Sequence, residues 1–364
     1  MKNNKILFIV RNDYLKNKGG DSIQVLNTAK YLKKLGFDVD IAKSNSYLRY
    51  SSDYSILHFF NLIRPSDFLI WLRRFKKTPK VISSIFVSYK STKNLSKVNS
   101  LIIDLFGEFF FEYLKNVYKM LISKLKPFSL EYIFLGHKKS MLKILKNSSF
   151  VLPNSYSELK RLNNIFGKIK YSVIPNGIDL DVFKKVNTDP KFEECVISVG
   201  RIEPIKNQLN IIRALSGIDT NVYIIGTHAP NHEKYYLECI KSAGKNIYFI
   251  DFVDQNKLNE IFNSAKVHVL ASWFETTGLV SLEAAYCGCN IIVTETGDQK
   301  DYFKDIADFC QPDSIESIKE KVLNALAKER NYKKPQKFIE EKYTWEIAAK
   351  ETAKVYNEIL VISK

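Results

Sequence analysis

Short apolar runs rich in β-branched residues alternate along the chain with longer segments of helical periodicity. The run 5–10 is followed by a polar loop containing two glycines, then by an amphipathic segment over 21–35 that Gly36 ends. Apolar runs of this kind are typical of strands buried on both faces of a parallel sheet. In the first half we predict strands at 5–10, 37–42, 54–60, 80–86, 149–152 and 171–174.

The same rhythm restarts after a turn at 175–177 and a polar linker at 184–190. The strands predicted there are 195–199, 222–225, 247–252, 267–270 and 290–294. The pattern predicts an α/β protein with two doubly wound Rossmann-like domains facing each other across a cleft. We expect an N-terminal domain at 1–178, a C-terminal domain at 179–341, and a helix at 342–364 that packs back toward the N-terminal domain. In such sheets, ligands bind beyond the carboxyl ends of the strands.

The cysteines and the hydropathy pattern favour a cytoplasmic protein. The chain of 364 residues has five cysteines, an odd number, and no C-x-x-C spacing. Reduced thiols fit this usage best, and a zinc site is not expected. No apolar stretch approaches the roughly 20 residues that a membrane span needs, and the first apolar run is too short for a signal-peptide core.

Charge is distributed unevenly. Residues 1–180 hold 31 Lys/Arg and 12 Asp/Glu, whereas residues 181–364 hold 24 and 27. A basic first half beside a near-neutral second half suggests that the N-terminal domain faces an anionic membrane or another polyanion. Within it, 101–146 interleaves aromatic residues with lysines, which fits a helix lying on anionic lipid or a core-facing helix with a solvated lysine face. No recognised nucleic-acid-binding motif occurs, and no nucleic-acid partner is expected.

The most informative motif is Phe274–Glu283, in which Glu275 and Glu283 flank a Gly-Leu-Val step. The step predicts that a helix begins near Gly278. An anion could then bind the free N–H groups of the first turn, with each carboxylate accepting hydrogen bonds from hydroxyl groups beside it. Hydroxyl, phosphate and hydroxyl in this order describe a nucleotide sugar. The alternative is a helix start with two ordinary surface acids.

Three further loops follow predicted strands of the same domain. The loop Gly200–Asn207 supplies Arg201, which can bind two phosphate oxygens at once, and Lys206, which adds a point charge. Gly226 follows the strand at 222–225, and 251–254 has a backbone that could contact a base edge.

These loops together resemble the C-terminal domain of family-4 (glycosyl transferases group 1) retaining glycosyltransferases of the GT-B fold. The resemblance extends to Asn176–Asp179 and to Glu283–Cys289. In the first half it is weaker and is carried by Gly19-Gly20-Asp21 and by Asp53–His58.

The resemblance implies roles for individual residues. Arg201 and Lys206 would neutralise the donor diphosphate and stabilise the departing nucleoside diphosphate, Glu275 would bind sugar hydroxyls, and Glu283 would bind the ribose. With His58 as a further polar contact to the sugar, the catalytic set is Glu275, Arg201, Lys206 and His58. The remaining donor contacts would be backbone amides or close approaches at Gly19, Gly20, Gly200, Gly226, Val253, Thr277, Gly278 and Leu279.

One loop departs from the family pattern, and one acidic triplet resembles a metal site without lying where such a site would. The loop after the fourth strand lacks the histidine that members often carry, so His58 is the nearest candidate, although it could equally be a satisfied core histidine. Asp179-Leu180-Asp181 has the spacing of a metal-binding triplet but lies in the interdomain linker. We interpret it as a turn and helix start and predict no catalytic metal and no cofactor.

The function expected from the resemblance is retaining, metal-independent transfer of a sugar from a UDP- or GDP-linked donor. The acceptor would be a cell-envelope glycan or a lipid-linked molecule, as in polysaccharide, O-antigen or capsule synthesis, with the protein cytoplasmic and peripheral on the inner leaflet. A nucleotide-sugar epimerase of the same architecture is one alternative, although no pair of bases is evident. A non-enzymatic nucleic-acid-binding protein is the other.

Overall fold

A computed structural model describes residues 4–16, 19–51, 53–87, 103–122, 129–228 and 231–362 of the chain. The chain divides into two compact units, one made of 1–90, 95–176 and 345–364 and the other mainly of 177–344. The predicted domain boundary at 178 lies two residues from this division. The expected C-terminal helix is α14 (Trp345–Ile362), which forms part of unit 1.

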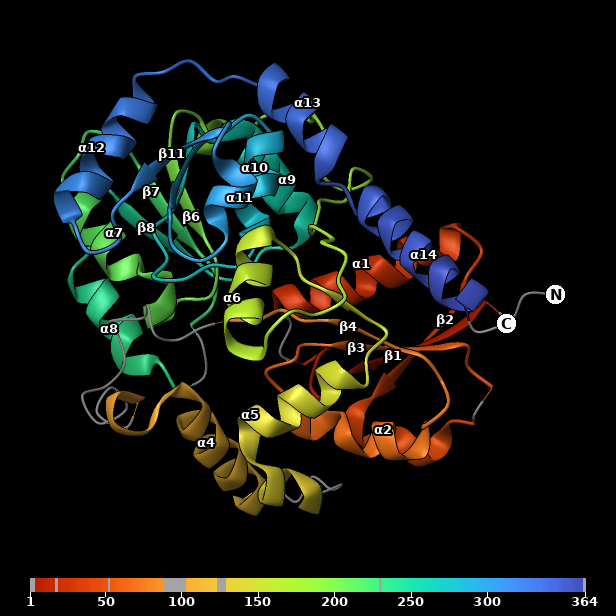
Figure 1. Ribbon diagram of the computed structural model, residues 1–364. Helices are drawn as coiled ribbons and strands as arrows, with labels where there is room; N and C mark the ends of the chain where they lie inside the picture. The colour runs from red at the N-terminus through yellow and green to blue at the C-terminus, as the bar shows by residue number, and fades with distance from the viewer. Residues whose placement is uncertain are drawn as a thin grey trace. The chain divides into compact units, whose positions relative to one another are not determined.

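Unit 1 is built on a five-stranded parallel sheet with the order β2-β1-β3-β4-β5 (Figure 1). Its strands are β1 (Lys5–Val10), β2 (Asp38–Lys43), β3 (Ile56–Phe60), β4 (Lys80–Ser83) and β5 (Phe150–Leu152). Its helices are α1 (Gly20–Lys34), α2 (Leu69–Arg74), α4 (Glu108–Ile122), α5 (Leu130–Lys146), α6 (Tyr156–Phe166) and α14. The predicted strand at 171–174 is wrong, because only Tyr171 forms a single bridge, with Val151.

The faces of this sheet follow the alternation of side chains along each strand. Leu7 and Leu57 point to the face where α2 and α5 pack, in a core that includes Trp71 and Met141. Tyr356 of α14 packs on the opposite face, over His58. Figure 1 shows α1 and α14 on one side of the sheet and α2 and α5 on the other. The inner strands β1, β3 and β4 are thus buried on both faces, which explains their largely apolar sequences, whereas the edge strand β2 is partly exposed.

Unit 2 holds a six-stranded parallel sheet with the order β11-β10-β9-β6-β7-β8. The strands are β6 (Val196–Val199), β7 (Val222–Ile225), β8 (Ile247–Ile250), β9 (Val267–Leu270), β10 (Asn290–Thr294) and β11 (Ala307–Cys310). The helices are α7 (Gln208–Leu215), α8 (Glu233–Lys241), α9 (Gln255–Ser264), α10 (Leu279–Tyr286), α11 (Gln299–Phe303), α12 (Ile315–Leu326) and α13 (Lys333–Lys342). The five strands predicted here are confirmed, and the sixth, β11, was not predicted.

Two cores cover the two faces of the unit 2 sheet. Ile197 and Ile225 belong to a core that includes Phe262 of α9 and Leu282 of α10. On the other face, strand residues such as Ile224 pack in a core with α7 and α12. The doubly wound α/β prediction is therefore confirmed for both units.

None of the helices in the described part of the chain has the length and apolar character needed to cross a membrane.

Candidate nucleotide-sugar site

All strands of the unit 2 sheet run parallel, so the loops that follow them meet at one edge. β6 lies between β9 and β7 in the sheet, and the strand order reverses there. The loops after β6 and β9 therefore flank the topological switch point, where open α/β sheets bind ligands. These two loops contain Arg201, Lys206 and Glu275, which were predicted as site residues.

The glycines after β6 and β7 allow two backbones to touch. Gly200 has φ +153° and Gly226 has φ +139°. A Cβ atom added to Gly226 would lie 2.2 Å from the carbonyl oxygen of Gly200. The Gly200 N–H donates to the carbonyl of Ile225 at 2.9 Å, which continues the pairing of the two strands. The backbone at this edge of the sheet therefore favours glycine at both positions, independent of any contact that they make with a ligand.

Lys206 and Glu275 form an ion pair, with Lys206 Nζ donating to Glu275 Oε2. The two side chains are only 21% and 13% exposed, so the pair is mostly shielded from solvent. Arg201 is half exposed and pairs with Glu203 at 3.0 Å. The cationic groups predicted to bind a diphosphate therefore lie next to carboxylates, which an incoming anion would have to replace as partners.

The loops that carry this ion pair are fixed to each other by backbone bonds. The N–H of Trp273 donates to the carbonyl of Ile205 at 2.9 Å. Asn207 adopts a left-handed conformation, and its side-chain amide donates to the carbonyl of Ala271 at 2.9 Å. Lys206 thus sits on a segment whose position relative to Glu275 is set by the backbone.

Glu275 is also held from its other side. Its backbone forms a parallel bridge with Gly297, and its carbonyl accepts from the N–H of Asp298 at 2.9 Å. Gly297 has φ +76°, and a Cβ atom there would lie 2.0 Å from the Glu275 carbonyl oxygen. Sequence analysis missed Gly297, although a glycine after a predicted strand of this domain was an available signal.

The helix start predicted at Gly278 is confirmed. Gly278 caps α10 in a left-handed conformation (φ 68°, ψ 52°), and α10 begins at Leu279. Glu275 precedes the first turn, and Glu283 lies inside the helix. Thr277 and Leu279 are both buried beside the cap.

Gln299 lies against the same helix start. A Cβ atom at Gly278 would be 2.7 Å from Gln299 Nε2, and the positive φ of 68° also favours glycine at the cap. Both amide atoms of Gln299 are buried with no hydrogen-bond partner among the described residues. The cap of α10 therefore has an unsatisfied amide directly beneath it, which the sequence did not predict.

Glu283 is 6% exposed, and burial raises the pKa of its carboxyl group to about 8. Desolvation favours the protonated form, and no other cause contributes to this shift. A buried acid in a helix interior is costly unless a partner joins it. Hydroxyl groups of a ligand would supply such partners.

Val253, predicted to lie beside the base, is partly buried in the loop after β8.

In unit 1, Gly19 is the N-cap of α1 and Gly20 is its first residue. Arg11, directly after β1, reaches this helix start: its Nε donates to Asp21 Oδ2 at 2.6 Å, and its Nη2 donates to Ser22 Oγ at 3.0 Å. Arg11 is buried, and it also pairs with Asp13 at 2.9 Å. Sequence analysis missed this arginine, which fixes the glycine turn to the end of β1.

His58 lies in the core. Its Nδ1 is 2.5 Å from the hydroxyl of Tyr356, and its Nε2 is 2.9 Å from the hydroxyl of Ser83. The ring stacks on Phe60, and burial lowers the pKa of His58 to about 3. With both nitrogens engaged and the side chain buried, the structure favours the alternative of a satisfied core histidine over contact with a sugar.

The Asp179–Asp181 segment forms the expected turn, since the N–H of Asp181 donates to Asp179 Oδ1 at 3.1 Å. No helix follows this turn. In the part of the chain that the structure describes, no three His, Cys, Asp or Glu side chains are grouped to hold a metal ion. The prediction of a metal-independent site stays a prediction.

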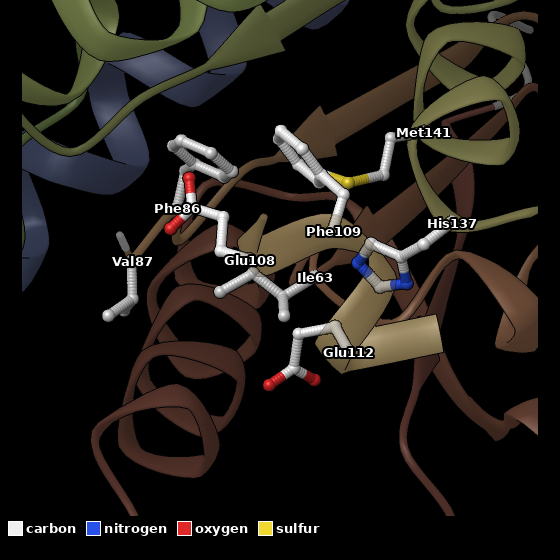
Figure 2. Close-up of a pocket in the computed structure, with 8 residues that line it drawn as sticks. All are labelled: Ile63, Phe86, Val87, Glu108, Phe109, Glu112, His137 and Met141. Atoms are coloured by element: carbon white, nitrogen blue, oxygen red, sulfur yellow. The ribbon is translucent and has the colours of Figure 1, made fainter. Parts of the chain in front are cut away.

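A small cavity lies in unit 1, beyond the end of β4, and is lined partly by residues of α4 and α5 (Figure 2). Figure 2 shows apolar side chains such as Phe86 and Met141 around it, together with His137 and the carboxylates of Glu108 and Glu112. Nδ1 of His137 lies 2.9 Å from the Tyr132 hydroxyl, and burial lowers the pKa of His137 to about 4. The volume of this cavity is about 10 Å³, far below that of a typical ligand pocket of roughly 300–1,000 Å³.

Part of this chain is similar in sequence to known proteins. Residues 180–345 match the family Glycosyl transferases group 1. A probable sucrose-phosphate synthase of Thermosipho melanesiensis is 30% identical over 201 residues, which cover 50% of this chain and 46% of the relative. An uncharacterized glycosyltransferase of Methanocaldococcus jannaschii is 29% identical over 177 residues, 45% of each chain. The matched region thus spans about half the length of the curated relatives.

Solved structures match over nearly the whole chain. A sucrose-phosphate synthase of Thermosynechococcus elongatus superimposes with a TM-score of 0.74 at 16% identity, covering 98% of this chain and 99% of the other. HepE of Anabaena, in complex with UDP-glucose, gives 0.68 at 12% identity, covering 97% and 99%. At this identity the likeness establishes the fold. The chain therefore has the GT-B fold, and its match to the family Glycosyl transferases group 1 is carried by residues 180–345.

Proposed function

We propose that this protein transfers a sugar from a nucleotide-diphosphate sugar to an acceptor hydroxyl. The observation that carries the proposal is the Lys206–Glu275 ion pair, which lies at the switch point of the unit 2 sheet. Beside it, α10 begins at Leu279, where the first N–H groups of a helix lack partners within the helix, and the buried Glu283 lies one turn further along. The cationic side chains and the helix start suit the diphosphate of such a donor, and the carboxylates can accept hydrogen bonds from the hydroxyl groups of its sugar and its ribose.

In the proposed reaction, the acceptor oxygen bonds to the anomeric carbon as the bond from that carbon to the diphosphate breaks. The departing phosphate oxygen takes the acceptor proton. Arg201 and Lys206 stabilise the charge that develops on the diphosphate, and Glu275 orients the sugar through its hydroxyls. We propose same-face attack with retention of the anomeric configuration and without a metal, as the family resemblance implies.

UDP is the first nucleotide to test. Solved structures of HepE, which share the fold, are complexes with UDP, with UDP and glucose, and with UDP-glucose. GDP stays in the proposal because the loop 251–254, expected beside the base, has no side chain that dictates uracil over guanine.

For the acceptor we propose a cell-envelope glycan or a lipid-linked molecule, met by unit 1 at the inner leaflet of the membrane. The basic charge of residues 1–180 supports this choice. A small phosphorylated acceptor is the second candidate, favoured by relatives named D-inositol 3-phosphate glycosyltransferase, of which one from Rhodococcus erythropolis is 23% identical over 177 residues. The epimerase alternative is not favoured by any of these relatives.

The test is release of nucleoside diphosphate from a panel of UDP- and GDP-sugars, with membrane extract, inositol phosphate or sugar phosphate as acceptor. We expect one donor to be consumed only with a matching acceptor, and Glu283→Ala to weaken donor binding. Glu320→Ala, an exposed acid on α12, is the matched control and should behave as wild type. Turnover that stops with EDTA and returns with Mg²⁺ would refute the metal-independent mechanism. Conversion of a donor to its epimer without acceptor would refute transfer.

A further inference from the structure

We propose that α4 and the start of α5 form a docking face for an anionic lipid bilayer. This inference deepens the proposed function, because it names the surface through which unit 1 would meet a membrane-bound acceptor. The docking face is defined by six exposed apolar side chains: Phe106, Phe110, Leu114, Tyr118, Leu130 and Phe134.

The apolar side chains of α4 extend beyond the face of the helix that packs against the core. Phe109, Tyr113 and Val117 pack against the core of unit 1. Phe110, Leu114 and Tyr118 repeat at the same four-residue interval, one position further round the helix, and are exposed. A helix that needed only a core contact would carry polar residues at these positions.

The apolar character continues at both ends of this stripe. Phe106, just before α4, is 63% exposed, and its ring lies 5.1 Å from that of Phe110. On α5, which packs on α4 through Tyr113, Phe134 is 87% exposed and Leu130 lies one turn before it. Monomeric soluble proteins seldom expose aromatic side chains in such number along adjacent helices, and those that do usually bind something there.

Charge identifies the partner. Lys138, Lys139 and Lys146 on α5 are exposed. Of the acidic residues that the structure describes in 103–146, Glu108 and Glu112 are buried, Glu131 pairs with Lys143, and Asp104 is exposed, so the surface keeps an excess of positive charge. Exposed aromatics beside lysines are the composition of a helix that lies in the interface of an anionic bilayer. A second copy of the chain is a poorer partner, because pairing two such faces would bring like charges together.

The core-facing alternative considered for 101–146 is therefore incomplete. One face of α4 does pack on the core, but its solvated side carries Phe110, Leu114 and Tyr118, and exposed lysines lie on α5. Residues 101, 102 and 123–128 lie outside the described residues and form no part of the argument.

The test is co-sedimentation of the full chain with phosphatidylcholine vesicles, with and without phosphatidylglycerol. We expect binding only to the anionic vesicles, weakened by salt. Combined Phe106→Ser, Tyr118→Ser and Phe134→Ser should lower the binding constant roughly tenfold or more. Lys138→Glu with Lys139→Glu should do the same.

Matched controls carry equal changes elsewhere. Leu48→Ser, Leu237→Ser and Val361→Ser remove three exposed apolar side chains outside the docking face. Lys333→Glu with Lys334→Glu reverses two exposed charges on α13. Both controls should bind anionic vesicles as wild type does, and all variants should keep the wild-type melting temperature and the release of nucleoside diphosphate from a soluble donor.

The inference would be overturned if wild-type protein did not bind anionic vesicles, or if the docking-face variants bound them as tightly as the controls do. So would self-association in the analytical ultracentrifuge that the apolar variants abolish, because the face would then bind a second copy. Donor turnover is measured separately, so wild-type protein that turns over a donor but does not bind anionic vesicles refutes only the docking face. Vesicle binding without turnover of any donor refutes only the proposed function.

Discussion

Lys206 donates a hydrogen bond to Glu275 across two loops that flank the switch point of the unit 2 sheet. The two residues are 69 positions apart in the sequence. Their pairing means that the groups proposed to bind the diphosphate and the sugar neutralise each other before a donor arrives. A donor diphosphate must therefore compete with Glu275 for Lys206, which gives the two residues opposite effects on binding.

We predict that Lys206→Ala lowers the affinity for the preferred nucleoside diphosphate roughly tenfold or more, because a charge-assisted hydrogen bond is lost. Glu275→Gln should leave that affinity unchanged or raise it, since Lys206 is freed, while sugar transfer falls. Isothermal titration calorimetry with the nucleotide, followed by turnover of its sugar, separates the two effects. Equal losses of nucleotide affinity in both variants would contradict the proposed division of roles.

Gly297→Ala should impair the site through Glu275. The added methyl group would meet the Glu275 carbonyl oxygen, so this backbone must shift and carry the carboxylate with it. We expect loss of donor turnover together with reduced stability. Gly217→Ala is the matched control, because Gly217 also has a positive φ (83°) but has no atom within 4 Å of the added Cβ. It should cost only about 1 kcal/mol of stability and leave turnover intact. Equal turnover in the two variants would argue against the steric link.

Glu283 should make stability depend on pH. Its pKa is about 8 in the folded protein and near 4.5 when unfolded, so between these values the folded state holds a proton that the unfolded state has released. The contribution of Glu283 to stability is therefore fully present below about pH 4.5 and is lost as the pH rises toward 8. Relative to Glu283→Gln, wild type should lose stability from pH 5 to pH 8, as measured by urea denaturation. A constant difference between the two proteins would mean that the carboxyl group is already ionised when folded.

His58→Phe tests whether this residue acts in the core or in catalysis. The substitution keeps an aromatic ring against Phe60 but leaves the hydroxyls of Tyr356 and Ser83 without their partner. We expect a stability loss of about 2–4 kcal/mol by denaturant unfolding, with donor affinity unchanged, because buried unpaired hydroxyls are costly. Unchanged stability with weaker donor binding would restore His58 to the active site.

Sequence patterns predicted most of the fold because parallel strands buried on both faces are apolar throughout. The strand edges at 222–225, 267–270 and 290–294 agree with the structure to the residue. The failures have local causes. Residues 171–174 are mostly β-formers but make one bridge only, at Tyr171. β11 pairs with β10 alone at the sheet edge, and its sequence Ala-Asp-Phe-Cys lacks the solid apolar run of an interior strand.

The helix start at Gly278 was predictable because a left-handed cap favours glycine, and the place of Lys206 and Glu275 at one edge of the sheet was predictable because each lies in a loop after a predicted strand; their roles stay a prediction. The residues that hold these side chains in place were not predictable. Gly297 contacts Glu275 only because β9 and β10 are neighbours in the sheet. Arg11 reaches Asp21 across a loop whose course no local pattern fixes. The burial of Glu283 and of His58 depends on packing from distant segments, so their chemistry could not be read from spacing alone.

The most direct test of the central claim is calorimetric titration of UDP and GDP into wild type, Glu283→Ala and the control Glu320→Ala. The account predicts that one nucleotide binds wild type and the control alike, and binds Glu283→Ala markedly more weakly. Binding of neither nucleotide to wild type, or equal binding to all three proteins, would contradict a nucleotide-sugar site at the start of α10.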